Sequence, residues 1–184
     1  MALPLGFNGS PFSFFSGESD TLPLSSPSAH FHGMPLRLLL GEGEKTLLSH
    51  AFSTLRPEQV LLVGARDLDP PESSFIEHKN LFTVSAVEVN HGNFTGITSR
   101  LIKSSSNKVY IHLDLDVIDP NEFPYVTCPT RDGIRIEKLK NLIDLLGKEF
   151  DVVGCSVLEF LPTETKKKAT LAVIKLLDSI GFRS

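Results

Sequence analysis

The sequence predicts an α/β protein in which helices cover both faces of a parallel sheet, in three layers. Short apolar runs typical of buried strands alternate along the chain with amphipathic patterns typical of helices. Clusters of ionisable residues follow directly after the predicted strands, where a parallel sheet holds its ligands. The 184 residues, of which 41% are hydrophobic, suffice for one domain with a substantial core.

The composition argues against several classes of protein. The net charge of −4 offers no electrostatic footprint for nucleic acid or an anionic membrane, and no apolar stretch is long enough to span a bilayer. The first residues lack the basic start and continuous apolar region of a signal peptide. The cysteines, Cys128 and Cys155, are too few for a disulfide framework and lack zinc-site spacing. We therefore expect a cytoplasmic protein that binds neither nucleic acid nor membranes.

Residues 1–27 are expected to be irregular, because they are rich in Ser, Pro and Gly and show little periodicity. The three phenylalanines between residues 12 and 15 favour a short strand, but the neighbouring serines weaken that prediction. We expect residues 1–20 to pack poorly.

The middle of the chain alternates helix and strand signals. In order, these signals predict a helix over 34–40, further helical turns over 46–55, a strand over 59–64, a helix starting near Ser73, a strand over 81–89 and a helix over 94–102. The apolar run over 109–115 predicts a strand at or near the centre of the sheet, because it needs cover on both faces.

Two helices and one strand are expected after the central strand. The spacing of leucines and isoleucines predicts a helix over 137–146, and the run 151–157 predicts a strand. A final helix over 163–180 has Thr163 as a plausible N-cap and Leu171, Ile174 and Leu177 on its inward face.

The apolar run from Val109 ends in an acidic cluster, which is the principal candidate site. Side chains of a strand alternate between its faces, so Asp114 and Asp116 should project to the same side. Two close carboxylates repel unless a cation lies between them, and hard divalent ions such as Mg²⁺ and Mn²⁺ prefer oxygen ligands. Pro120 ends the strand and so places the cluster at its carboxyl end. The alternative is that these aspartates cap the following loop and pair with basic side chains.

Four segments share a pattern with known enzymes: Phe-His-Gly-Met-Pro at 31–35, Gly-Ala-Arg-Asp-Leu-Asp-Pro at 64–70, His-Leu-Asp-Leu-Asp-Val-Ile-Asp-Pro at 112–120 and Val-Gly-Cys-Ser-Val-Leu-Glu-Phe-Leu-Pro at 153–162. Together they resemble the arginase and agmatinase family of ureohydrolases. The resemblance implies an arginase-like parallel sheet, a Mn²⁺ centre and hydrolysis of a small guanidino substrate to urea and an amine. It also makes a homo-oligomer a candidate assembly.

The resemblance further implies a role for each matching residue. By motif, the implied roles are metal ligands for Asp114 and Asp116, a proton shuttle for His32, a guanidinium-holding carboxylate for Glu159, and contacts with the amino-acid end of the substrate for Ser28 and Asp69. An imidazole can shuttle protons near neutrality, and a carboxylate pairs naturally with a planar guanidinium. The structural alternatives are that His32 caps a helix and that Asp69 is a turn residue before Pro70.

The chain departs from the family pattern in its metal ligands. The family's Gly-Gly-Asp-His-like motif is absent, and its Asp-Ala-His-x-Asp motif should fall near Phe15 to Ser19. A shift by one residue brings Glu18 and Asp20 to ligand positions but supplies no histidine. The sequence therefore predicts an arginase-like fold that is N-terminally incomplete. Because most expected ligands are missing, we expect weak binding of Mn²⁺, with fewer than two ions per chain.

Three functional hypotheses stay open at this point. The first is an arginase-type ureohydrolase with impaired activity, and the second is a non-catalytic pseudoenzyme, interaction subunit or truncated family fragment that keeps the fold. The third is a different metal hydrolase built on His30, His32, Asp114 and Asp116. Under the first hypothesis, the predicted catalytic, substrate and metal residues converge on one crevice.

Overall fold

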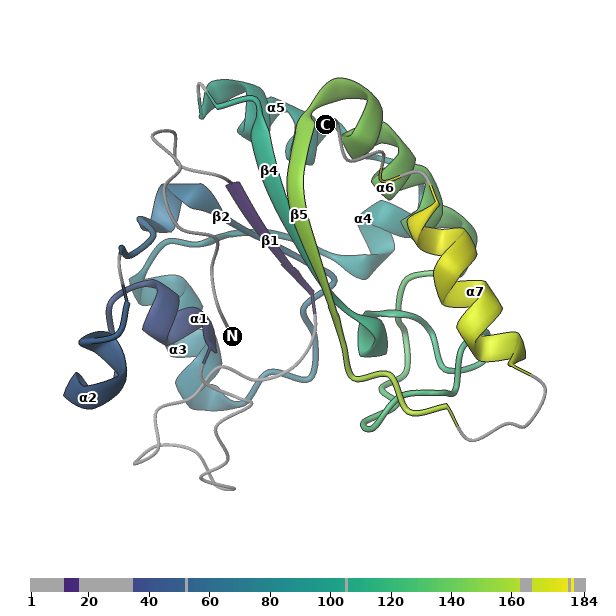
Figure 1. Cartoon of the computed structure of the whole chain (residues 1–184), viewed down its shortest axis with the longest axis horizontal. Helices are drawn as coiled ribbons and strands as arrows, with labels where there is room; N and C mark the ends of the chain where they lie inside the picture. Colours follow the sequence, from purple (N-terminus) through teal and green to yellow (C-terminus); the bar gives the residue numbers. More distant parts are fainter. Residues whose placement is uncertain are drawn as a thin grey trace.

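The computed structural model describes residues 12–16, 35–51, 53–104, 106–162, 167–178 and 180. Within them, five strands form one sheet in the order β3-β2-β1-β4-β5, and every neighbouring pair is parallel (Figure 1). The strands are β1 (Phe12–Ser16), β2 (Val60–Val63), β3 (Phe82–Val84), β4 (Lys108–Asp114) and β5 (Asp151–Leu158). The helices are α1 (Pro35–Leu39), α2 (Lys45–Leu48), α3 (Pro70–His78), α4 (Ala86–Asn90), α5 (Thr95–Lys103), α6 (Ile136–Glu149) and α7 (Lys168–Leu177).

Helices cover both faces of the sheet, as the two separate cores on either side of β2 show. Leu61 and Val63 belong to the larger core, to which α4, α5, α6 and α7 contribute. Val60 and Leu62 belong to a smaller core with α1 and α3. This alternation is the normal geometry of a strand buried on both sides. The predicted three-layer α/β/α fold with a parallel sheet is confirmed.

The strand expected near the centre of the sheet is β4, and it lies between β1 and β5. Its apolar residues Val109, Ile111 and Leu113 are buried in the larger core. The prediction is therefore confirmed, although the middle position of the sheet belongs to β1.

The expectation that residues 1–27 are irregular is wrong for Phe12–Ser16, which form β1. Phe14 is in register with Leu61 of β2 on one side and with Ile111 of β4 on the other. Pairing on both sides gives every strand peptide a partner, and this outweighs the weak strand preference of the serines. The rest of residues 1–27 lies outside the described residues.

The strand expected over 81–89 ends at Val84, and α4 follows it. Ser85 Oγ accepts a hydrogen bond from Glu88 N at 3.2 Å, and Glu88 Oε2 accepts one from Ser85 N at 2.9 Å. This reciprocal capping box starts a helix inside a stretch whose alternation resembles a strand.

The inward face of α7 also differs from the prediction. Leu171 and Ile174, expected to face inward, are 53% and 50% exposed, whereas Ala169 and Leu176 are buried. Leu177 packs against the larger core, as expected. The helix packs on α6 (Figure 1), and a single helix neighbour buries a narrower stripe than a sheet would.

Thr163, the expected N-cap of the last helix, lies outside the described residues. In the part of the chain that is described, no helix has both the length and the apolar character needed to cross a membrane.

Candidate active site

The carboxyl ends of β4 and β5 lie side by side and carry three of the predicted site residues. Asp114 is in register with Leu158, the residue that precedes Glu159. Asp116 follows two residues after the end of β4. Figure 1 shows β4 and β5 side by side, and because the two strands are parallel their carboxyl ends meet at the same end of the sheet. The three residues therefore lie at the carboxyl end of the sheet. Their convergence with His32 and Asp69 on one crevice stays a prediction.

The acidic segment Asp114–Asp119 is not a continuation of the strand. β4 ends at Asp114, and Leu115–Val117 forms a 3-10 turn. The expectation that strand alternation places Asp116 on the side of Asp114 is therefore wrong in its premise. Asp116 is only 2% exposed, and both of its carboxylate oxygens are buried, as is Oδ1 of Asp114.

A neighbouring loop holds the backbone of this acidic segment. Ile134 N donates to Val117 O at 2.8 Å, and Asp119 N donates to Ile134 O at 3.0 Å. Gly133 lies against the same backbone so closely that a Cβ atom there would come within 2.5 Å of Asp119 N. Asp119 Oδ1 accepts a hydrogen bond from Asn121 N at 2.9 Å, so this third carboxylate stabilises the following turn.

Asp69 lies in the loop after β2 and caps α3. Its Oδ1 accepts a hydrogen bond from Glu72 N at 2.9 Å, and Glu72 Oε2 accepts one from Asp69 N at 2.7 Å. This capping box, together with Pro70 at the first position, makes α3 begin at Pro70 and not near Ser73. The alternative of a structural role for Asp69 is thus realised in the structure.

Glu72 is a candidate site residue that sequence reasoning missed. Its side chain is 2% exposed, and Oε1 is buried with no hydrogen-bond partner among the described residues. Buried polar groups normally have partners, so this oxygen keeps the capacity to accept a hydrogen bond from a ligand. The sequence signal was the spacing Asp69-x-x-Glu72, which indicates a capping box but not its burial.

Glu159 has an unusual backbone. It follows β5 directly and adopts φ +58°, in the left-handed region that non-glycine residues rarely visit. Such a conformation costs of order 1–3 kcal/mol and is found where the surroundings hold a side chain in a required direction. The next residue, Phe160, pairs with Val126 in an antiparallel bridge, which fixes the chain just beyond the glutamate.

His112 lies one strand away from Ser156, and the two side chains share a hydrogen bond of 2.7 Å between Nδ1 and Oγ. Burial lowers the pKa of His112 below its ordinary value of 6.5. The imidazole is therefore neutral at pH 7, and it cross-links β4 and β5 two residues before Asp114.

The described residues do not fit a centre of two metal ions. Among them, no three His, Cys, Asp or Glu side chains lie close enough together to hold a metal. Asp114 and Asp116 fit part of the coordination shell of one hard cation, because carboxylate oxygens are the ligands that such ions prefer.

Several predicted residues cannot be placed. Ser28, His30 and His32 lie outside the described residues, as do Glu18 and Asp20. β1, which precedes Glu18 in the sequence, ends with Ser16 in register with Leu113, next to Asp114.

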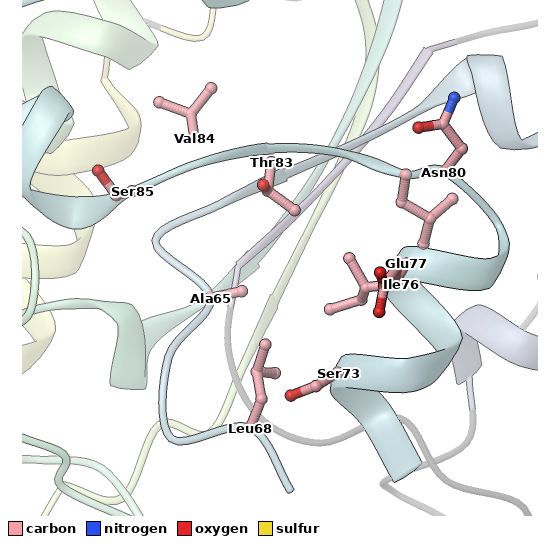
Figure 2. Close-up of a pocket in the computed structure, with 10 residues that line it drawn as sticks. Ala65, Leu68, Ser73, Ile76, Glu77, Asn80, Thr83, Val84 and Ser85 are labelled. Carbon is pink, nitrogen blue, oxygen red and sulfur yellow. The ribbon is translucent and has the colours of Figure 1, made fainter. Parts of the chain in front are cut away.

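A hollow of about 380 Å³ lies between α3 and β3 (Figure 2). Its walls include Ser73 and Ile76 of α3, Thr83 of β3, and Ala65 and Leu68 of the loop before α3. The lining contains none of the predicted site residues, so the hollow is distinct from the segment Asp114–Asp119 at the carboxyl end of β4.

The sequence model of the arginase family matches residues 19–181. The arginase of Staphylococcus aureus (strain MRSA252) is 31% identical over 145 residues, which cover 77% of this chain and 48% of the relative. The arginase of Bacillus subtilis (strain 168) is 29% identical over 169 residues, covering 89% and 57%. The chain thus spans about half the length of the curated relatives it matches.

Solved structures agree with these sequence matches. The crystal structure of arginase from Bacillus subtilis superposes with a TM-score of 0.84 at 26% identity, covering 96% of this chain and 65% of that one. The Entamoeba histolytica arginase in complex with L-ornithine has a TM-score of 0.83 at 23% identity, covering 94% and 60%, and supports the fold alone.

Proposed function

We propose that this chain, which belongs to the arginase family, carries part of a ureohydrolase site. In this site, the Asp114 and Asp116 carboxylates bind a hard cation and Glu159 binds a guanidino substrate. The observation that carries this proposal is the register of β4 and β5, which brings the acidic segment after β4 and Glu159 after β5 to the same carboxyl end of the sheet. The substrate class is a small guanidino compound, which such an enzyme hydrolyses to urea and an amine.

Glu159 has the chemistry to bind the guanidinium. A carboxylate and a planar guanidinium form two parallel charge-assisted hydrogen bonds, which fix both the position and the plane of the substrate. The left-handed backbone of Glu159 restricts the directions available to this side chain. Asp69 contributes indirectly in this scheme, because its carboxylate is engaged at the start of α3.

The cation of this proposal is Mn²⁺, for which Asp114 and Asp116 supply two oxygen ligands. A bound divalent ion acts as a Lewis acid and makes water a better nucleophile. Two carboxylates leave most of the coordination shell to solvent, so we expect weak binding of fewer than two ions per chain. His32 and Ser28 keep the proton-shuttling and substrate roles implied by the family pattern.

A second candidate function is that of a non-catalytic family member. It is favoured by one observation, namely that the described residues contain no group of three metal-binding side chains. Such a protein would bind guanidino compounds through Glu159 without hydrolysing them.

Calorimetric titration with Mn²⁺, combined with urea release from arginine and agmatine, separates the two candidates. We expect weak, substoichiometric binding that Asp116→Asn abolishes and the matched variant Asp69→Asn retains. Arginine binding should be lost in Glu159→Gln and kept in Asp69→Asn.

Three outcomes would decide the matter. Two tightly bound ions with arginine-dependent urea release would indicate a complete ureohydrolase centre with ligands beyond Asp114 and Asp116. Arginine binding without Mn²⁺ binding would support the non-catalytic candidate. Mn²⁺ binding that survives Asp116→Asn would refute the metal site proposed here.

A further inference from the structure

Arg66 lies in the loop after β2 and connects three segments of the molecule through one guanidinium. Its Nη2 donates to Asp116 O and, at 2.9 Å, to Thr130 O. Its Nε donates to Arg131 O at 3.1 Å, and its Nη1 to Gly64 O at 3.4 Å. All four acceptors are backbone carbonyls, so these four hydrogen bonds of Arg66 hold main chain.

We propose that Arg66 is a positioning residue that fixes the direction of the Asp116 carboxylate at the site proposed above. The inference rests on that proposed function for its consequence, but on the hydrogen bonds alone for its mechanism.

The carbonyl of Asp116 belongs to the 3-10 turn Leu115–Val117, which carries the acidic side chain. Rotation of this turn would move the Asp116 carboxylate and break the bond to Arg66 at the same time. Ile134 also holds this segment, through Val117 O at 2.8 Å and Asp119 N at 3.0 Å. Two residues from different parts of the chain thus hold the turn.

The chemistry of an arginine side chain suits it to this role. A guanidinium offers five N–H donors in one rigid plane and stays charged at every relevant pH, so it can bind several carbonyls from different segments at once. A lysine ammonium is a flexible point charge that cannot reproduce this fork. Hydrogen bonds that involve a charged donor are also about twice as strong as neutral ones.

Arg66 also connects the acidic turn to a second loop. Arg66 and Asp69 share the loop between β2 and α3, in which Asp67 adopts the left-handed conformation with φ +55°. The same guanidinium therefore ties the loop that carries Asp69 to the turn that carries Asp116. Binding sites lose much of their affinity when supporting residues leave ligating groups loosely held.

A matched control is available in Asn90, the last residue of α4. Its Nδ2 donates to Gly133 O at 3.0 Å, and its Oδ1 accepts from Arg135 N at 2.9 Å. Asn90 therefore stabilises the same loop as Arg66 but makes no hydrogen bond with the acidic turn in the described contacts. A purely structural role of Arg66 predicts that the variants Arg66→Met and Asn90→Ala behave alike.

The experiment uses native-state hydrogen exchange and the Mn²⁺ affinity, read from the electron paramagnetic resonance signal of free Mn²⁺. In Arg66→Met, the amides of Asp119 and Ile134 should exchange about tenfold faster than in the wild type, while the Ile111 amide of β4 is unchanged. The Mn²⁺ affinity should fall about tenfold, with partial recovery in Arg66→Lys. Asn90→Ala should lower the melting temperature with a clearly smaller loss of affinity, because Asn90 reaches the acidic turn only through the neighbours of Ile134.

Unchanged exchange at Asp119 and Ile134 in Arg66→Met would overturn the proposal, as would an equal loss of Mn²⁺ affinity in Asn90→Ala. If the wild-type protein binds no Mn²⁺, the proposed metal site fails, and the exchange rates alone still decide whether Arg66 holds the turn.

Discussion

Two acidic segments follow strands of the same sheet, and they differ in how their main chain is held. In Asp67–Glu72, the side chains of Asp69 and Glu72 bind the backbone at the start of α3. In Asp114–Asp119, Asp119 Oδ1 binds Asn121 N, but the backbone of the turn is held by Arg66 and Ile134. Local carboxylates thus hold the first segment, whereas residues remote in sequence hold the turn of the second.

This difference shows how to distinguish a structural aspartate from a candidate ligand. A carboxylate that accepts a hydrogen bond from a helix N-terminus contributes to stability. When neighbouring residues fix the main chain of an aspartate, its carboxylate is held in position without serving as a helix cap. Such a carboxylate can bind a ligand. Substitutions in the first segment should therefore lower stability, whereas substitutions around the second should lower ligand affinity as well as stability.

The largest expected effect comes from breaking the support of the second segment at Gly133. A Cβ atom at this position would lie 2.5 Å from Asp119 N and 2.7 Å from Val117 O, both of which are backbone atoms that cannot move aside. Gly133→Ala should therefore destabilise the protein by about 3 kcal/mol, measured by urea denaturation.

The control is Gly96→Ala in α5, where the nearest atom to the added Cβ is Phe82 Cζ at 3.7 Å. This variant should be as stable as the wild type or more stable by up to about 0.5 kcal/mol, because alanine has the higher helix propensity and Gly96 lies in the first turn of α5. Equal stability of the two alanine variants would show that Gly133 does not lie in close contact with the backbone of the acidic segment.

A smaller effect is expected in the first segment. Asp69→Ala removes the N-cap of α3 and should cost about 1 kcal/mol of unfolding free energy. Asp69→Asn should stay within a few tenths of a kcal/mol of the wild type, since asparagine is an equally good N-cap. Thermal and urea unfolding of both variants would check this, and a similar loss in both would mean that the charge of Asp69, not its capping bond, matters.

The smallest effect sharpens the comparison through thiol labelling. Cys128 is exposed near the loop that Arg66 holds, whereas burial raises the pKa of Cys155 in β5 to about 11. Iodoacetamide at pH 8 should therefore modify Cys128 first, because the thiolate is the reactive species.

Cys155 is partly buried, so its labelling combines slow direct attack, limited by its raised pKa, with attack through transient opening. In Asp69→Ala, its rate should rise by at most about fivefold, which corresponds to a loss of about 1 kcal/mol. Mass spectrometry of the labelled protein over time would measure both rates. Modification of Cys155 as fast as that of Cys128 in the wild type would contradict the raised pKa of Cys155.

The sequence alone determined the elements whose signal is local. The apolar runs of β2, β4 and β5 indicated buried strands, and the regular spacing of leucines in α6 indicated an amphipathic helix, since Leu139, Leu142, Ile143 and Leu146 are all buried. The order of four motifs indicated the family and hence the fold. It also placed the candidate carboxylates at strand ends.

Only the tertiary structure decided the elements whose signal depends on distant partners. Phe12–Ser16 became the middle strand because β2 and β4 pair with it on both sides. The exposed Leu171 and Ile174 follow from the packing of α7 on α6, which no periodicity in α7 itself reveals. Packing between segments remote in sequence overrides local preference in both cases.

The same reason governs the candidate site. The sequence showed Asp69 and Asp116 as equivalent aspartates after strands. The spacing Asp69-x-x-Glu72 indicates the local capping bond of Asp69. Only the fold brought the guanidinium of Arg66, 50 residues away in the chain, to Asp116. Hydrogen bonds between residues so far apart leave no periodic trace in the sequence, because each depends on how the whole sheet is assembled.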